Sequence, residues 1–236
     1  MCDYFILTKD RNSNINDDDN NQIISLNQDV YILPKNDIKY YIEKGLFEKN
    51  LIEWCKQFCE KNKNILDIGA HSGTYSISLA NYCKHVYAFE PQKMTFYSLC
   101  GSIALSGIKN VSCLNYGLGS IEQVGIQKLN IISIDGGGST LHTNNLNHRI
   151  IQQEDIEIRT LDSFNISDIG FIKVDVEENE LQVLLGGIET ICKSNYPKIL
   201  FEMNVKNSKL IEFLVNLKYN IVPINGYENM YLASML

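Results

Sequence analysis

The stretch Asn64-Ile-Leu-Asp-Ile-Gly-Ala-His-Ser-Gly-Thr-Tyr75 decides the fold of this chain. Its apolar run 65–68 predicts a short buried strand, because polar residues and glycines bound the run closely. Gly69 and Gly73 permit a sharp turn, and the apolar spacing that follows predicts a helix over 75–82. A strand, a glycine turn and a helix build a nucleotide site at the carboxyl end of a strand in an α/β sheet.

The same alternation of strand and helix continues along the chain. Further strands are predicted at 85–89, 111–114, 171–176 and 198–202, and helices at 93–106, 177–185 and 208–217. Two last strands, 221–224 and 230–233, are expected as an antiparallel pair that completes the sheet. Repeated β-α units predict an α/β fold with a mostly parallel seven-stranded sheet and helices on both faces.

Residues 121–160 break this rhythm. Segments 124–129, 131–134 and 154–159 have strand character, and Gly136-Gly-Gly-Ser-Thr140 is a flexible loop, so the region resembles an inserted hairpin. We expect Ser139, Thr140 and His142 of this loop to contact a substrate, because loops carry function on rigid scaffolds. A solvent-exposed loop without that role is equally compatible with the sequence.

The N-terminal region is the least regular part. Segments 4–7 and 31–34 can form strands, 10–22 is a polar loop, and 37–45 can form a helix that ends at Gly45. A wide apolar face predicts a further helix over 46–61. We therefore interpret 1–45 as an N-terminal cap segment on a main domain of residues 46–236, a single-domain protein.

Composition narrows the classes of function. A net charge of −7 argues against a broad nucleic-acid interface, which would require a basic face. No apolar stretch approaches the length of a membrane span, so no membrane partner is expected. The 7 cysteines are scattered and fit reduced thiols of an intracellular protein, which predicts a cytoplasmic location. The oligomeric state stays open.

The residues of the glycine turn favour one cofactor over another. A dinucleotide site would use G-x-G-x-x-G, whereas this turn has a single glycine pair four residues apart. Asp67 ends the strand, and a carboxylate there would repel a pyrophosphate at contact range. It would attract the ammonium and sulfonium of S-adenosylmethionine, which carries no phosphate. The sign of this charge therefore favours the methyl donor.

Other residues complete a predicted nucleoside pocket. Glu90 ends strand 85–89 about twenty residues after the glycines, where an acid can accept both ribose hydroxyls. His71 lies within the turn, as a cofactor contact or as a solvated histidine. Asn115, in the turn after strand 111–114, joins the predicted cofactor-binding set of Asp67, Gly69, His71, Gly73, Glu90 and Asn115.

Two blocks of the sequence carry a family resemblance. Leu66-Asp-Ile-Gly-Ala-His-Ser-Gly73 followed by Phe89-Glu-Pro91 resembles the Rossmann-like class I methyltransferase core. The block Thr160-Leu-Asp-Ser-Phe164, Phe171-Ile-Lys-Val-Asp-Val-Glu177 and Glu180-Leu181 resembles the FkbM methyltransferases more specifically. The resemblance spans roughly 46–204 and implies O-methylation with S-adenosylmethionine, often of sugar or polyketide hydroxyls. Glu178-Asn179 departs from the small Gly-Ala pair usual in that family.

Methyl transfer to a hydroxyl benefits from a base that accepts its proton. We expect Asp175, Glu177 and Glu202 to be catalytic, because they lie at the carboxyl ends of two strands beside the cofactor. Asp175 is the first choice for the base, and Lys173 is a possible ion partner of Glu202. Three carboxylates can also hold a divalent metal, but no histidine joins them at a recognisable spacing, so we predict no metal.

The leading hypothesis is an O-methyltransferase that acts on a small acceptor, with a sugar or glycan first. A polyketide-like molecule, a protein or, against the acidic surface, an RNA are alternative acceptors. A nicotinamide-dependent oxidoreductase is a second class, disfavoured by Asp67 and the missing third glycine. A third is a non-catalytic module that binds S-adenosylmethionine.

Overall fold

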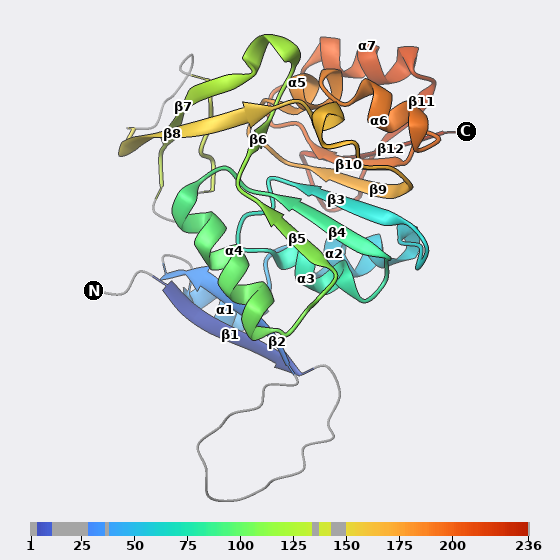
Figure 1. Ribbon diagram of the computed structural model, residues 1–236. Helices are drawn as coiled ribbons and strands as arrows, with labels where there is room; N and C mark the ends of the chain where they lie inside the picture. Colours follow the sequence, from blue (N-terminus) through green and yellow to red (C-terminus); the bar gives the residue numbers. More distant parts are fainter. Residues whose placement is uncertain (1–3, 11–27, 36–37, 134–136, 143–149, 236) are drawn as a thin grey trace, which may run out of the picture.

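Seven strands form the central sheet, in the spatial order β11-β12-β10-β9-β3-β4-β5 (Figure 1). The computed structural model describes residues 4–10, 28–35, 38–133, 137–142 and 150–235. Strands β3, β4, β5, β9 and β10 are parallel, and β12 is antiparallel to both β10 and β11. The strand bounds are β3 Asn64–Ile68, β4 His85–Phe89, β5 Val111–Leu114, β9 Ile169–Val174, β10 Lys198–Glu202, β11 Tyr219–Pro223 and β12 Met230–Met235. The predicted α/β, Rossmann-like architecture is confirmed.

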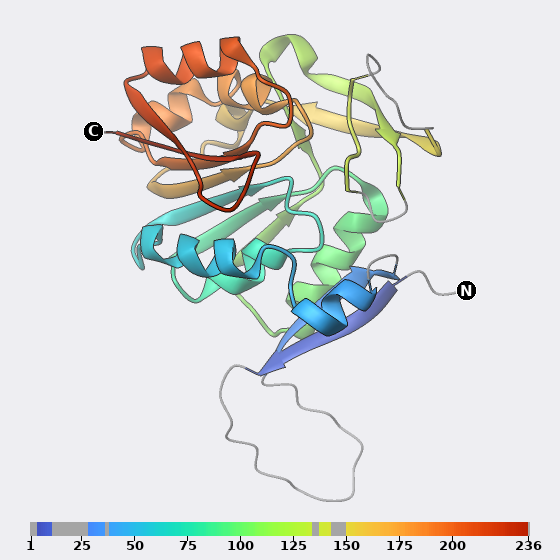
Figure 2. The ribbon, with the colours of Figure 1, turned by 180° about the vertical axis from the view of Figure 1, so that it is seen from behind.

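Helices cover both faces of this sheet (Figures 1 and 2). One face carries α2 (Lys49–Cys55), α3 (Thr74–Ala80) and α4 (Lys93–Leu105), and the other carries α5 (Glu180–Leu185), α6 (Ile188–Lys193) and α7 (Ser208–Asn216). A parallel strand covered on both sides is apolar along its whole length. Strand β3 is accordingly buried at every position, its acid Asp67 included.

The N-terminal region packs against helix α4. Strand β1 (Tyr4–Asp10) pairs antiparallel with β2 (Gln28–Pro34), and α1 (Ile38–Lys44) follows. Three serines one turn apart on α4 bond to the backbone of β2: Ser98 donates to the Ile32 carbonyl, while Ser102 and Ser106 accept from the Ile32 and Val30 N–H groups. The helix thus satisfies backbone groups of β2. The polar run 11–22 lies outside the described residues, and the boundary at 45/46 stays a prediction.

The insertion forms a second, three-stranded sheet. Strand β7 (Gly125–Ile131) pairs antiparallel with β8 (Gln152–Arg159), and the short β6 (Gly117–Leu118) pairs parallel with β8. The prediction of a separate strand at 131–134 is wrong for its described part. Because β7 extends to Ile131 and takes its partner from β8, Ile132 and Ser133 lie outside any strand. Residues 134 and 136 of the predicted strand and loop lie outside the described residues.

Two predicted element boundaries also need correction. Strand β9 ends at Val174 and α5 begins only at Glu180, because Glu177 and Glu178 adopt left-handed backbone with φ of 52° and 76°. Asp175 and Glu177 therefore lie on a loop and not on a strand end and a helix. The predicted helix 46–61 is limited to α2 and a 3-10 turn, Lys56–Phe58, and α6 was not predicted. Among the described residues, no helix combines the length and the apolar character needed to cross a membrane.

Candidate active site

A cavity of about 350 Å³ opens at the carboxyl ends of the parallel strands. Its walls come from the turns after β3, β4 and β9, from the end of β10, from the inserted sheet and from the N-terminal region. The volume is that of a small-molecule site. Such a crevice at the carboxyl ends of parallel strands is the usual ligand site of an open α/β sheet.

The glycine turn brings the ends of β3 and β9 into close contact. Gly69 has a φ of +76°, and a Cβ placed on it would lie 1.8 Å from the Asp175 carbonyl oxygen. Gly73 has a φ of +87° and faces the Leu99 side chain, at 2.7 Å from the same hypothetical atom. Both positions therefore require glycine, and Gly69 does so because backbone meets backbone. Gly69 lines the cavity, whereas Gly73 lies behind it.

Glu90, which follows β4, lines the cavity. Its two carboxylate oxygens accept the backbone N–H groups of His71 and Gln92, each at 2.9 Å. Burial raises its pKa to about 7. Asn115 does not line the cavity; its side-chain amide donates to the carbonyls of Glu90 and Pro91, so it holds the turn after β4 in place.

Asp67 lies behind the cavity wall, which corrects the expectation that its charge faces the cofactor directly. The Asp67 side chain is 2% exposed, accepts the Ser76 hydroxyl at 2.6 Å and lies 3.9 Å from the Lys173 ammonium. The residue is absent from the described cavity lining. Its negative charge is therefore directed at Lys173, its cross-strand partner in the register of β3 and β9.

Lys173 connects the glycine turn to the loop after β9. Its ammonium donates to the Gly69 carbonyl at 2.8 Å and forms an ion pair with Asp175 at 3.1 Å. Burial lowers the pKa of Lys173, but the charges of Asp175 and Asp67 outweigh it and leave the pKa raised. The prediction that Lys173 would pair with Glu202 is wrong, since the described ion pairs of Lys173 are with Asp67 and Asp175.

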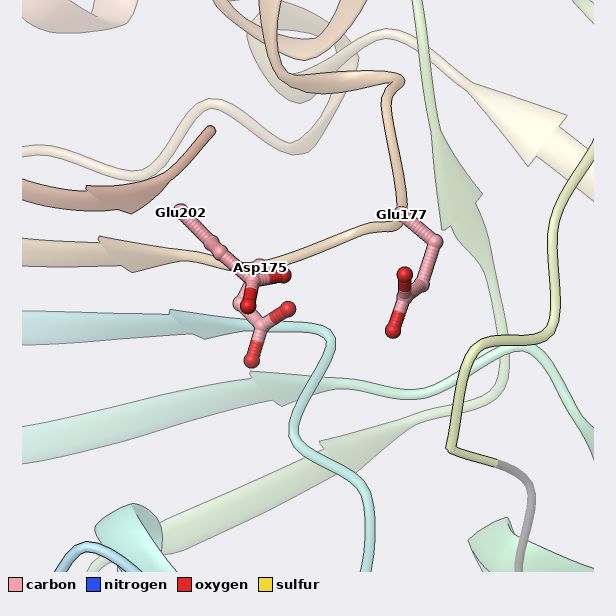
Figure 3. A group of neighbouring side chains, drawn as sticks. All are labelled: Asp175, Glu177 and Glu202. Atoms are coloured by element: carbon pink, nitrogen blue, oxygen red, sulfur yellow. The ribbon is translucent and has the colours of Figure 1, made fainter. Parts of the chain in front are cut away.

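Asp175 and Glu177, on the loop after β9, lie together with Glu202 at the end of β10 (Figure 3). One carboxylate oxygen from each lies within 4.8 Å of the others, a spacing that also suits a shared divalent ion. Burial, the charge of Asp175 and the charge of Glu177 raise the pKa of Glu202 to about 8. Burial and the charge of Asp175 raise that of Glu177 to about 7. Near neutral pH Glu177 and Glu202 therefore carry protons part of the time.

The loop 137–142 is bonded to this acidic cluster. The Gly138 N–H donates to the Glu177 carboxylate at 2.9 Å, and the Ser139 hydroxyl donates to the Gln92 side chain at 3.0 Å. Thr140 and His142 donate to the Glu177 and Glu178 carbonyls. Ser139 lines the cavity, whereas Thr140 and His142 are absent from the described lining and hold the loop in place.

Sequence reasoning missed the wall formed by the N-terminal region. Tyr41, Phe47 and Glu48 line the cavity together with Tyr75, whose hydroxyl donates to the Glu48 carboxylate at 2.7 Å. No pattern marks Glu48, which lies in the segment 46–61 that was predicted only as a helix. Tyr75 was assigned only to the start of a helix. The buried lysine within the apolar run of β9 was the one sequence feature that pointed to a charged partner nearby.

The side chains fit S-adenosylmethionine as the predicted cofactor. Each Glu90 oxygen has one N–H donor and keeps a lone pair for a ribose hydroxyl. Apolar side chains of the inserted sheet, Leu129, Ile156 and Ile158, line the same cavity and suit an adenine ring. The acids that follow β9 and end β10 suit the positively charged sulfonium of this cofactor. They also suit an acceptor hydroxyl that loses its proton during methyl transfer.

Comparison with known proteins gives a family match. The family model described as "Methyltransferase FkbM domain" matches residues 67–221. A crystal structure of Methyltransferase FkbM from Methylobacillus flagellatus KT is 16% identical, with a TM-score of 0.52 over 73% of this chain and 44% of that chain. This chain thus spans less than half the length of that structure. No curated protein matches the chain in sequence.

Two further solved structures share the fold. A precorrin-6y C5,15-methyltransferase from Geobacter metallireducens GS-15 is 12% identical, with a TM-score of 0.52 over 82% of this chain and 91% of that chain. A precorrin 8w decarboxylase from Methanobacterium thermoautotrophicum is 14% identical, with a TM-score of 0.50 over 80% and 90% of the two chains. At these identities the structural likeness concerns the fold alone.

Proposed function

The chain belongs to the FkbM family of S-adenosylmethionine-dependent methyltransferases, and on this premise we propose that it transfers a methyl group to a hydroxyl of a small acceptor, a sugar or glycan. The observation that carries this proposal is the group Asp175, Glu177 and Glu202. The three carboxylates meet beside the glycine turn, where a methyl group bound over that turn would face them.

Glu90 and the glycine turn bind the donor in this proposal. The Glu90 carboxylate accepts the ribose hydroxyls, and Gly69 lets the ligand approach the backbone closely. S-adenosylmethionine supplies an activated methyl group when bound, so alignment and exclusion of water provide much of the acceleration. Asp67 and Lys173 contribute by holding the turn and Asp175 in a fixed relation.

Asp175 is the proposed base for the acceptor hydroxyl. Lys173 contacts Asp175 Oδ2 at 3.1 Å, and the Asp175 side chain is 32% exposed, so a substrate hydroxyl can reach this carboxylate. Glu202, with a pKa of about 8, carries a proton at neutral pH and donates to a neighbouring oxygen. Glu177, with a pKa of about 7, is poised to exchange protons near neutrality.

The charges of the cavity support a neutral polyhydroxyl acceptor. Carboxylates are strong acceptors for sugar hydroxyls. Lys173 is the one lysine or arginine in the described lining, and it already bonds to Gly69 and Asp175. The phosphates of an acceptor such as RNA would be repelled by these carboxylates, and the described lining offers no unpaired lysine or arginine to bind them. The cavity therefore disfavours RNA as the acceptor.

The test is transfer of labelled methyl from S-adenosylmethionine to a panel of neutral sugars, glycans, sugar phosphates and RNA. We expect labelling of a neutral glycan. Asp175→Asn and Glu202→Gln should lower kcat by about 10²-fold or more while affinity for S-adenosylhomocysteine is kept. Glu212→Gln, at an exposed position of α7, is the matched control.

Four outcomes contradict the proposal. If the wild-type protein binds neither S-adenosylmethionine nor S-adenosylhomocysteine, the assigned cofactor is wrong. If the purified protein retains NAD, it belongs to the oxidoreductase class instead. Labelling of RNA or protein alone would replace the acceptor. Unchanged turnover in Asp175→Asn and Glu202→Gln would refute the assigned chemistry even with the donor correct.

A further inference from the structure

The amino-acid end of the donor has no partner in the scheme above. S-adenosylmethionine ends in an ammonium and a carboxylate, and an ammonium in a partly buried cavity requires an acceptor or an opposite charge. Asp67 was the sequence-based candidate, but its carboxylate is 2% exposed and is directed at Ser76 and Lys173. The partner must come from another residue on the cavity wall.

The described lining contains five carboxylates, and the proposed function occupies four of them. Glu90 is assigned to the ribose, while Asp175, Glu177 and Glu202 form the cluster at the acceptor. Glu48 is the fifth, and it lies directly before α2, beside the cavity wall that Tyr41 of the N-terminal region adds. With the ribose at β4 and the methyl group toward β9 and β10, the amino-acid end must extend toward this third wall.

The environment of Glu48 is that of a carboxylate prepared for a cation. It accepts the Tyr75 hydroxyl at 2.7 Å and, within the described part of the chain, forms no ion pair. Its backbone is left-handed, with a φ of 53°, which is uncommon for a residue other than glycine. Burial raises the pKa of Glu48 more than the Tyr75 hydrogen bond and the charge of Lys173 lower it, because low-dielectric surroundings disfavour the charged form.

We propose that Glu48 binds the ammonium group of the amino-acid end of S-adenosylmethionine, with the Tyr75 hydroxyl holding the Glu48 carboxylate in place. Tyr75 also faces Lys173, whose ammonium lies 5.4 Å from the ring centroid. This inference rests on the proposed function, because it takes the donor as given.

The experiment is a cycle of two proteins and two ligands measured by calorimetry. The ligands are S-adenosylhomocysteine and its analogue in which hydrogen replaces the ammonium group. Wild type should bind the first about tenfold to a hundredfold more tightly, the range of a hydrogen bond to a charged group. In Glu48→Gln that preference should fall to about twofold or less, while affinity for the analogue is unchanged.

Two controls separate the effect of removing the Glu48 charge from an effect on folding. Glu43→Gln removes an exposed charge of α1 in the same N-terminal region and should keep the full preference of wild type. Thermal unfolding shows whether each variant is folded, and Glu48→Ala takes the place of Glu48→Gln in the cycle if the latter does not fold.

Each contrary result has its own meaning. Wild type that binds both ligands equally, or Glu48→Gln that keeps the preference, overturns the role of Glu48. Equal loss of affinity for both ligands also overturns it, since Glu48 would then shape the pocket without contacting the ammonium. Wild type that binds neither ligand refutes the proposed function instead, so the two failures are distinguishable.

Discussion

Replacement of Gly69 by alanine tests the close approach of the two strand ends on which the site depends. The added Cβ would lie 1.8 Å from the Asp175 carbonyl oxygen and 2.9 Å from its carbon. Contacts below 3.0 Å are essentially never seen for real Cβ atoms, so the two backbones must separate by at least 1.2 Å. Such a shift would break the hydrogen bond from the Asp175 N–H to the Ile68 carbonyl, now 3.1 Å long.

Three effects determine how far Gly69→Ala lowers the free energy of unfolding. Left-handed backbone at a non-glycine residue costs about 1–2 kcal/mol, overpacking about 1–3 kcal/mol, and the lost hydrogen bond about 1 kcal/mol. We therefore expect Gly69→Ala to lower the free energy of unfolding by about 3–6 kcal/mol. Gly107→Ala is the matched control, because Gly107 has a φ of +62° but nothing within 4 Å of the hypothetical Cβ. It should lose only about 1–2 kcal/mol.

Urea unfolding, followed by circular dichroism and by the fluorescence of Trp54, measures both variants. Calorimetry with S-adenosylhomocysteine then asks whether folded Gly69→Ala has lost affinity, as a displaced Asp175 and turn predict, whereas Gly107→Ala keeps it. Equal destabilisation of the two variants would refute the reasoning, since left-handed strain alone would then account for both. Unchanged ligand affinity in Gly69→Ala would show that the turn does not hold the donor.

Three further perturbations test the electrostatics and the backbone of the site. Lys173→Met leaves two carboxylates facing each other without a cation and should cost about 3–5 kcal/mol in urea unfolding; adding Asp67→Asn should recover part of the loss, and no recovery would contradict the assigned ion pair. Glu178→Gly removes left-handed strain at φ 76° and should stabilise the fold by about 0.5–1 kcal/mol, whereas Glu178→Ala, which keeps the strain, should not. The free energy of unfolding should also fall as the pH rises from about 5 to about 8, because the folded state holds protons at Glu90, Glu177 and Glu202 that the unfolded state releases. The fall is at most about 1.4 kcal/mol per pH unit for each group. It is smaller where solvent screens the charge. Chemical unfolding of the apoprotein at four pH values checks this sign, and a flat or rising profile would contradict the raised pKa values.

Local patterns predicted most of the central sheet. The bounds of β4, β5 and β10 agree with those expected, and β3 differs by one residue. These strands are short apolar runs closed by polar or glycine residues, a signal that depends only on neighbours in the chain. The prediction failed at the loop after β9, because the left-handed conformation of Glu177 and Glu178 is imposed by contacts with distant segments and not by local propensity.

The insertion was predicted in part. The antiparallel pair of β7 and β8 confirms the inserted hairpin, but the separate strand expected at 131–134 is absent, because β7 runs on to Ile131 and pairs with β8, which begins 21 positions later. Strand pairing of this kind depends on which edge is available in the folded protein, so alternation along one strand cannot select the partner.

The sequence by itself determined the α/β alternation, the glycine turn at Gly69, the acid at Glu90 and the gathering of three acids at one edge of the sheet. The tertiary structure alone decided what those groups face. Asp67 and Lys173 are 106 positions apart and become partners through the register of β3 and β9, and Glu48 reaches the cavity through packing of the N-terminal region. A periodic pattern reports which side of a strand is buried, but a charge acts on its nearest neighbours in space, and those neighbours are set by strand register and packing.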